Sequence, residues 1–337
     1  MDEALFRDIL EIDSTSGQER GLAQWLAGRL EGFAPETECM EVGNGTLNLF
    51  LKWGSPDIVF CTHLDTVPPY IAPTFTGDKV LGRGSCDAKG QIISILGACS
   101  RLAERGHSNF GALFVSGEET GSWGAKAFAR TPFRAEYLVV CEPTDNCIVS
   151  ASKGTKSFDL TFEGEAFHSG YPEGGRSAVE MFVDFCNELR DAGFPEDPIL
   201  GATTYNIGLL HSDNPQNILS PRLQCRIYFR TTFASDSAVC EWMTRERPNI
   251  SVSPRGGDAP ARYHTVEGIP SKAVAFGSDA PHLDNFAKRM ICGPGSIMVA
   301  HRDNEYILKN DIEKAITNYL HIYESCNQRL WQDGPYH

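Results

Sequence analysis

The sequence predicts an α/β fold: a mixed, mostly parallel sheet with helices on both faces, interrupted by a smaller α+β domain. Short apolar runs such as residues 111–115 and 137–141 fit buried parallel strands, and helix-length segments separate them. From residue 153 to residue 263 the order of elements changes to β-α-β-β-α-β, which is typical of a ferredoxin-like domain. We therefore expect a discontinuous main domain, residues 1–152 and 264–337, with an inserted domain over residues 153–263.

Apolar spacing predicts the elements of the first part of the chain. Two amphipathic helices, one around Ile9 and one around Leu26, come first. Gly43-Asn44-Gly45 predicts the turn of a hairpin whose outgoing strand covers residues 47–51. The segments that follow are a strand over 57–62, a helix over 89–105, a strand over 111–115, a helix over 122–130 and a strand over 137–141.

The same patterns predict the inserted domain and the return to the main sheet. The inserted domain is expected to contain strand 157–162, helix 177–191, strands 203–210 and 223–232, helix 236–245 and strand 249–253. A glycine- and proline-rich linker over 254–260 leads back to the main domain. We expect residues 273–276 and 290–295 to resume the main sheet, and a helix over 310–326 to close it.

Composition narrows the class of partner and the compartment. The 337 residues carry a net charge of −14, which argues against binding to nucleic acid or to an anionic membrane surface. No run of about 18 apolar residues is present to span a membrane, and the acidic N-terminal segment does not resemble a secretory signal. The 11 cysteines are scattered, with several in apolar strand-like runs, which favours a reducing cytoplasm over a disulfide scaffold.

Metal-type ligands follow the predicted strands. His63, Glu119 and Glu142 come just after strands, Asp87 lies at the mouth of a helix, and His301 lies beyond the last strand. Singly, each is more often an ordinary polar loop residue than a ligand. In an open α/β sheet, however, the carboxyl ends of the strands gather at one edge, where ligands bind. Imidazole and carboxylate groups without thiolates suit catalytic zinc, and a carboxylate shared by two metals gives a two-metal site.

Two further acids extend this predicted site. Glu118 precedes Glu119, and because adjacent side chains point different ways, one can hold a metal while the other handles a proton. The alternative is a solvated pair of glutamates in a loop. Asp65 lies two residues after His63 and could orient its imidazole, although an aspartate that caps a turn is the alternative.

These residues stand in motifs that resemble a known family. The motifs are His63-Leu64-Asp65-Thr66-Val67-Pro68, the stretch Gly82–Gly90, Glu118-Glu119, Glu142-Pro143 and His301. They resemble the acetylornithine deacetylase and succinyl-diaminopimelate desuccinylase family of co-catalytic zinc amidohydrolases, related to carboxypeptidase G and aminoacylase. With the inserted domain, the resemblance covers nearly the whole chain and implies a zinc exopeptidase-like fold. The stretch from Gly293 to Glu305 is most similar to the small acetylornithine and acetylcitrulline deacetylases.

The resemblance implies a role for each residue of the predicted metal site. His63 and Glu142 would each hold a different metal, with Asp87 bridging the two. Glu119 and His301 would complete the two sites, and Glu118 would be the general base. One or two Zn²⁺ ions per subunit are implied, with Co²⁺ able to substitute, and the peptide bond after Asp87 is expected to be cis.

It also implies residues that bind the substrate. His168, in the inserted domain, would reach the active site of a partner subunit in a homodimer and stabilise the oxyanion; the alternative is a surface histidine. Asn217 and Arg230 would bind the substrate carboxylate, although Arg230 alone would suit a surface ion pair. Gly293 and Gly295 would offer backbone N–H groups to the same carboxylate, unless they simply form a tight turn.

The expected function is the zinc-dependent deacylation of an N-acyl amino acid in the cytoplasm. N-acetylornithine and N-acetylcitrulline, substrates of arginine biosynthesis, are the candidates that the resemblance favours. Within the same chemistry, a desuccinylase or a di- or tripeptidase is the alternative. A non-catalytic binding module on the same fold is an alternative of another class, whereas a serine hydrolase is set aside because the chain has no Gly-x-Ser-x-Gly motif.

Overall fold

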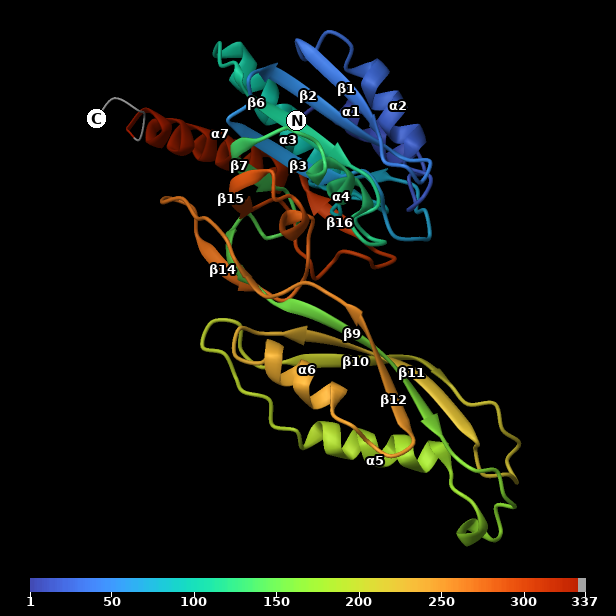
Figure 1. Cartoon of the computed structure of the whole chain (residues 1–337). Coiled ribbons are helices and arrows are strands. Elements are labelled where there is room, and N and C mark those ends of the chain that lie inside the picture. The colour runs from blue at the N-terminus through green and yellow to red at the C-terminus, as the bar shows by residue number, and fades with distance from the viewer. Residues whose placement is uncertain (333–337) are drawn as a thin grey trace. The chain divides into compact units, whose positions relative to one another are not determined.

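The computed structural model describes the backbone of residues 1–332 and the side chains of residues 1–328. The chain forms two compact units (Figure 1). The first consists of residues 1–150, 263–272 and 278 onward, and the second of residues 151–262 and 273–277.

The first unit is built on a six-stranded sheet. Four neighbouring strands of this sheet run parallel, and two further strands extend it in antiparallel fashion at one side. This confirms the predicted mixed, mostly parallel sheet. The strands lie in the order β1 (Glu36–Glu41), β2 (Leu47–Gly54), β6 (Asn109–Val115), β3 (Ile58–His63), β7 (Ala135–Val140) and β15 (Phe286–Ile291).

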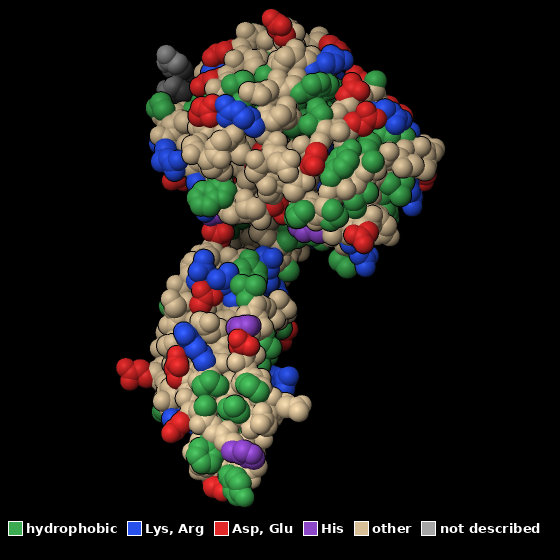
Figure 2. All heavy atoms as spheres, turned by 90° about the vertical axis from the view of Figure 1, so that its right-hand side faces the viewer, with side chains coloured by type: hydrophobic (Ala, Val, Ile, Leu, Met, Phe, Trp, Pro, Cys, Tyr) green, Lys and Arg blue, Asp and Glu red, His purple; other side chains and the backbone are tan. Residues whose placement is uncertain are grey.

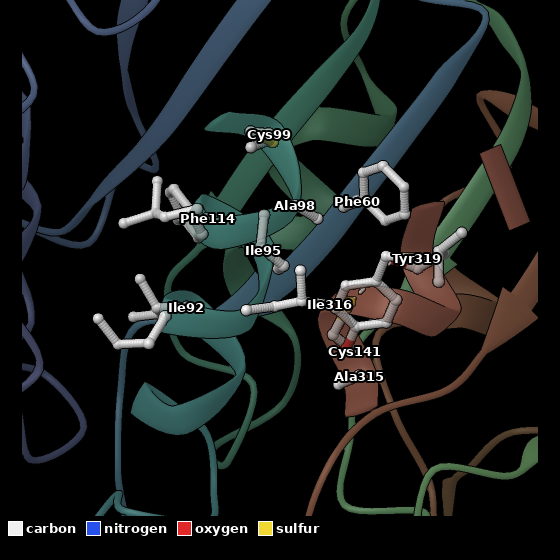
Figure 3. Close-up of a cluster of buried hydrophobic side chains, with 14 of the residues drawn as sticks. Phe60, Ile92, Ile95, Ala98, Cys99, Phe114, Cys141, Ala315, Ile316 and Tyr319 are labelled. Carbon is white, nitrogen blue, oxygen red and sulfur yellow. Dashed lines mark hydrogen bonds between the residues drawn. The ribbon is translucent and has the colours of Figure 1, made fainter. Parts of the chain in front are cut away.

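Helices cover both faces of this sheet (Figure 1). Helices α1 (Glu3–Glu11), α2 (Arg20–Arg29), α3 (Lys89–Glu104) and α7 (Lys309–Gln332) pack on one face, and α4 (Trp123–Ala129) lies on the other. Helix α3 is buried on nearly all sides, because strand residues contact one side of it and α7 contacts another. Figure 3 shows this packing, with Ile95 of α3 beside Ile316 of α7 and Ala98 of α3 beside Phe60 of β3.

The inserted unit has the predicted ferredoxin-like order. Its elements are β9 (Gly154–Glu163), α5 (Ala178–Arg190), β10 (Thr204–His211), β11 (Arg222–Thr231), α6 (Asp236–Thr244) and β12 (Ile250–Gly256). The antiparallel strands lie in the order β10-β11-β9-β12. Side chains of β11 alternate between buried and exposed, so Ile227 and Phe229 face the helices while Arg226 pairs with Asp159 on the open face.

One predicted element is placed differently. Residues 273–276 were expected to resume the main sheet, but β14 (Ser271–Val274) belongs to a separate three-stranded sheet with β8 (Ile148–Ser152) and β13 (Ala261–Arg262). Its side chains alternate between exposed and half-buried, which does not suit a strand buried on both faces. Part of the predicted linker also continues β12, which ends at Gly256.

A second three-stranded sheet lies in the first unit. It joins β4 (Thr74–Phe75), β5 (Lys79–Leu81) and β16 (Tyr306–Leu308), which the sequence did not predict. Short 3₁₀ turns cover Pro172–Gly174 and Ala280–His282. Over residues 1–332, no helix has both the length and the apolar character needed to cross a bilayer. On the face drawn in Figure 2, basic and acidic side chains are interspersed.

Candidate metal centre

The carboxyl ends of three adjacent parallel strands bring the predicted ligands together. His63 is the last residue of β3, which lies between β6 and β7 in the sheet. Glu118 and Glu119 follow β6, and Glu142 follows β7. Because the three strands run in the same direction, their following residues meet at one edge. Asp87, just before α3, and His301 complete the cluster.

Among the described residues, the possible ligand atoms form three groups, and within each group the atoms lie within 4.8 Å of one another. Two groups share Asp87: the first contains His63, Asp87 and Glu142, and the second contains Asp87, Glu119 and His301. The third contains His63, Glu118 and Glu119, so it competes with the other two for His63 and Glu119. Nε2 of His63 is 3.0 Å from Oδ1 of Asp87. Nε2 of His301 is 3.3 Å from Oδ2 of Asp87 and 2.8 Å from Oε1 of Glu119.

This grouping corrects the expected assignment of two ligands. His63 and Glu142 were expected on different metals, but they lie in the same group. The strand order allows this, because β3 and β7 are adjacent, with Cys61 paired to Val140, and the residues that follow them are neighbours. The peptide bond between Asp87 and Ala88 is cis, as expected.

Titration behaviour reflects this concentration of acids and imidazoles. Burial raises the pKa of Glu118 and of Glu142 well above the usual range of a carboxyl group. Hydrogen bonds with Asp87 and Glu119 raise the pKa of His301 to about 10. Burial opposes the ionisation of Asp87, but hydrogen bonds from His301 and His63 outweigh it and lower the pKa of this carboxyl group.

The residues present fit a divalent metal. Oε1 of Glu142 is buried and has no hydrogen-bond partner within the described part of the chain. A buried, unpaired carboxylate oxygen costs folding free energy unless another group, such as a metal ion, binds to it. Imidazole nitrogens and carboxylate oxygens without a cysteine make up both groups, which is a donor set suited to zinc.

Asp65 positions more than the imidazole of His63. Nδ1 of His63 lies 2.9 Å from the backbone carbonyl of Asp65 and 3.4 Å from its carboxylate. That carboxylate accepts hydrogen bonds from the backbone N–H groups of Glu118 (3.0 Å) and Glu119 (3.2 Å), and from the Ser16 hydroxyl (2.8 Å). Asp65 therefore fixes the turn that carries both glutamates, which the sequence did not predict.

Comparison with known proteins agrees with this geometry. A sequence profile of "Peptidase family M20/M25/M40" matches residues 59–325. The chain belongs to this family. A peptidase M20 domain-containing protein of Schizosaccharomyces pombe is 31% identical to this M20 chain over 335 residues, which covers 94% of this chain and 82% of that protein. A probable carboxypeptidase of Aspergillus clavatus is 30% identical and covers 96% and 88%.

Solved structures share the fold of this M20 chain. A tripeptidase from Staphylococcus aureus has a TM-score of 0.82 at 17% identity, covering 95% of this chain and 96% of its own. An M20 family metallo-carboxypeptidase from Sulfolobus solfataricus has a TM-score of 0.72 at 18% identity, covering 96% and 99%. M20 peptidases are metal-dependent hydrolases of amide bonds, so the predicted class of enzyme is confirmed over the non-catalytic alternative.

The backbone N–H of Gly293, a candidate for binding the substrate carboxylate, donates to the Thr144 hydroxyl (2.9 Å) in this structure. A Cβ atom at Gly293 would lie 2.3 Å from Oε1 of Gln91 and 2.6 Å from the carbonyl oxygen of Glu142, so glycine is required there by packing. Gly295 has a φ of +77°, in the region that favours glycine, and stays a candidate.

The inserted unit of the M20 chain separates its three candidate residues into two places. His168 and Asn217 lie together in two segments that pair with each other. His168 forms a β-bridge with Ile218, and the Ser169 N–H donates to the Asn217 carbonyl. Arg230 pairs with Thr155 near the point where the chain enters the unit, whereas Arg222, at the other end of β11, pairs with Glu163. The eight-residue step along β11 from Arg222 to Arg230 spans roughly 27 Å, and it separates Arg230 from the end of the sheet where β9 leads toward His168.

Sequence reasoning missed one acid of this M20 site. Asp279 is almost fully buried, and its Oδ1 has no hydrogen-bond partner among the residues that the structure describes. Burial raises its pKa to about 6, although the charge of His63 opposes this shift. The only signal in the sequence is an acidic residue inside the short segment Gly277-Ser278-Asp279-Ala280, which belongs to none of the motifs that indicated the site.

Proposed function

We propose that this M20 enzyme hydrolyses the amide bond of an N-acyl amino acid, with N-acetylornithine or N-acetylcitrulline as the substrate that its motifs favour. The observation that carries this proposal is the pair of ligand groups that share Asp87, with the acid Glu118 next to them. Zinc, one or two ions per subunit, is the proposed metal, and cobalt is expected to substitute for it.

The proposed roles follow from where each side chain lies. A divalent metal in either group would lower the pKa of water and polarise the substrate carbonyl. Glu118 accepts the proton of the attacking water and donates it to the nitrogen of the leaving amino acid. Its raised pKa, caused by burial, suits an acid that must hold and then release a proton. Asp65 keeps Glu118 in position through the hydrogen bond to its backbone N–H.

Exchange of Glu118 for alanine tests the role of base. Turnover should fall by a factor of about 10²–10⁴, while metal content measured by atomic emission stays near the wild-type value. The matched variant Glu119→Ala should lose metal instead, because Glu119 belongs to a group that contains Asp87, whereas Glu118 belongs only to the third group, with His63 and Glu119. If Glu118→Ala loses its metal, the two roles are exchanged.

A homodimer is proposed to complete the active site. His168 and Asn217 lie at the end of the inserted sheet opposite Arg230, so one substrate molecule cannot contact all three side chains of one chain. A partner subunit can supply His168 and Asn217 while Arg230 of the first subunit binds the carboxylate. Mixing His168→Ala with Glu118→Ala subunits, each inactive alone, should restore activity; no activity after proven subunit exchange would contradict this arrangement.

Short peptides are the second candidate class of substrate. Relatives about 30% identical to this chain are described as probable carboxypeptidases, and a peptide with a free C-terminal carboxylate presents the same groups as an N-acyl amino acid. A screen with zinc and with cobalt should compare acetylornithine, acetylcitrulline, succinylated amino acids and di- and tripeptides. Faster hydrolysis of peptides than of acetylated amino acids would favour the second candidate.

We also propose that the enzyme acts in the cytoplasm. Cys61, Cys141 and Cys225 are buried free thiols in strands or directly after one, as is usual for a protein kept in a reducing compartment.

A further inference from the structure

We propose that a buried ion pair between Arg83 and Glu305 holds the second ligand group, Asp87–Glu119–His301, in its metal-binding geometry. The inference rests on the proposed function, because it assumes that this group binds a metal. Arg83 and Glu305 are positioning residues: neither belongs to a ligand group, and neither was assigned a role by the motifs of the sequence.

Glu305 holds the backbone that carries Asp87. Its Oε1 accepts hydrogen bonds from the backbone N–H groups of Cys86 (3.0 Å) and Asp87 (3.1 Å). Its Oε2 accepts a hydrogen bond from Nη1 of Arg83 at 2.7 Å. The side chain is fully buried, so each of its contacts acts in a low-dielectric environment, where such charged hydrogen bonds are strong.

Arg83 connects the same carboxylate to two other loops. Its Nη1 also donates to the carbonyl of Arg302 (3.1 Å), in the loop that carries His301. Its Nε donates to the carbonyl of Pro69 (3.3 Å), in the loop that begins after His63. The guanidinium is 2% exposed, and its planar, branched donors fit several acceptors at once, which a lysine cannot reproduce.

The two ligand groups depend on this pair unequally. In the second group, Asp87 is held by Glu305 directly and His301 is held through Arg302 and the short loop to Glu305. In the first group only Asp87 depends on it, because His63 ends a central strand and is fixed by the Asp65 carbonyl, and Glu142 follows another central strand. Loss of the pair should therefore weaken the second metal more than the first.

The test is a metal titration of Glu305→Gln, which keeps the shape of the side chain and removes its charge. Zinc would be titrated in competition with a chelator, and cobalt would be followed by its visible absorption spectrum. We expect the first dissociation constant to stay within about threefold of wild type and the second to rise by about 10–100-fold. The spectrum should then resemble that of His301→Ala, which lacks a ligand of the second group.

The matched control is Glu324→Gln, which breaks an ion pair with Arg105 between half-exposed side chains on the surface. It should leave both metals unchanged. If Glu305→Gln does not fold, as judged by circular dichroism of the metal-free protein, Arg83→Lys carries the test with the same criterion, because it keeps the charge but not the branched contacts.

The outcomes separate this inference from the proposed function. A wild-type protein that binds no zinc would overturn the proposed function. A wild-type protein that binds two zinc ions, beside a folded variant whose second dissociation constant changes by less than threefold, would overturn this inference alone. Equal weakening of both metals, or a wild-type protein with a single zinc site, would overturn it as well.

Discussion

Replacing Asp65 by asparagine should disable the enzyme through the turn that carries Glu118, without removing the metal. The carboxylate accepts hydrogen bonds from the N–H groups of Glu118 and Glu119 on separate oxygens, and from the Ser16 hydroxyl. Asparagine has one acceptor oxygen, so its NH₂ group must face one of these N–H groups. His63 keeps its contact with the Asp65 carbonyl, which the substitution does not touch.

The size of the effect follows from these contacts. One buried backbone N–H is left without an acceptor, which costs about 1–3 kcal/mol of folding free energy. The displaced turn moves Glu118 from its position beside the ligand groups, and loss of such a supporting contact lowers activity by about 10–100-fold. Burial opposes ionisation of Asp65, but hydrogen bonds from His63, Ser16 and Glu118 outweigh it and lower its pKa, so the charge is present at neutral pH.

A matched control is Asp197→Asn in the inserted unit. Asp197 is also buried, and its carboxylate also accepts backbone N–H groups, those of Ile199 and Leu200 at 2.9 Å on one oxygen and that of Ala234. The same substitution therefore disturbs a comparable set of contacts at a residue that belongs to no ligand group. Urea unfolding, kcat/KM on the best substrate and zinc content would be measured for both variants. An Asp65→Asn enzyme with kcat/KM within threefold of the control would refute the reasoning, and loss of zinc would show that the carboxylate mainly orients His63.

Three further predictions follow from the structure. Hydrogen bonds with Asp87 and Glu119 raise the pKa of His301 to about 10, so metal binding at neutral pH should release about one proton more in the wild type than in His301→Ala. Calorimetry in buffers of different ionisation enthalpy measures this release, and equal release by the two proteins would contradict the prediction. Burial lowers the pKa of Lys89 to about 8, so above that pH the unfolded chain binds more protons than the folded one. Compared with Lys89→Met, the wild type should gain about 1.6 kcal/mol of unfolding free energy from pH 8 to 9.5, and a constant difference between the two would count against this. Gly293→Ala should displace the Glu142 backbone and weaken zinc binding in the first ligand group. Gly21→Ala, where a Cβ meets no atom within 4 Å, should leave zinc binding unchanged. Unchanged zinc affinity in Gly293→Ala would contradict the prediction and show that the backbone shifts without moving Glu142.

The ligands of the candidate site could be predicted because each signal is local. His63, Glu119 and Glu142 stand directly after apolar runs, and parallel strands bring such positions together at one edge. What could not be predicted depends on distant contacts. The grouping of His63 with Asp87 and Glu142 depends on how β3, β7 and the start of α3 meet, and the N–H group of Gly293 donates to the hydroxyl of Thr144, 149 residues earlier.

The same limit applies to the fold. The inserted unit could be predicted because its strands alternate and its helices are amphipathic, so each element carries its own pattern. Strand β14 has four residues, none of them fully buried, and no pattern distinguishes its two possible sheets. Asp65 looked like a partner of His63 alone, because its bonds to Glu118 and Glu119 join residues more than 50 positions apart.

The position of the insertion also sets the order in which a growing chain can assemble the two ligand groups. His63, Asp87 and Glu142 are all synthesised before the ferredoxin-like unit begins, whereas His301 is added 159 residues after Glu142 (301 − 142). At about 5–20 residues per second, a ribosome needs roughly 8–30 s for that distance. During this interval α3 also lacks α7, which packs against it in the finished protein. A nascent chain can therefore offer the first ligand group, but the second exists only after the C-terminal segment has joined a sheet begun by the N-terminal one.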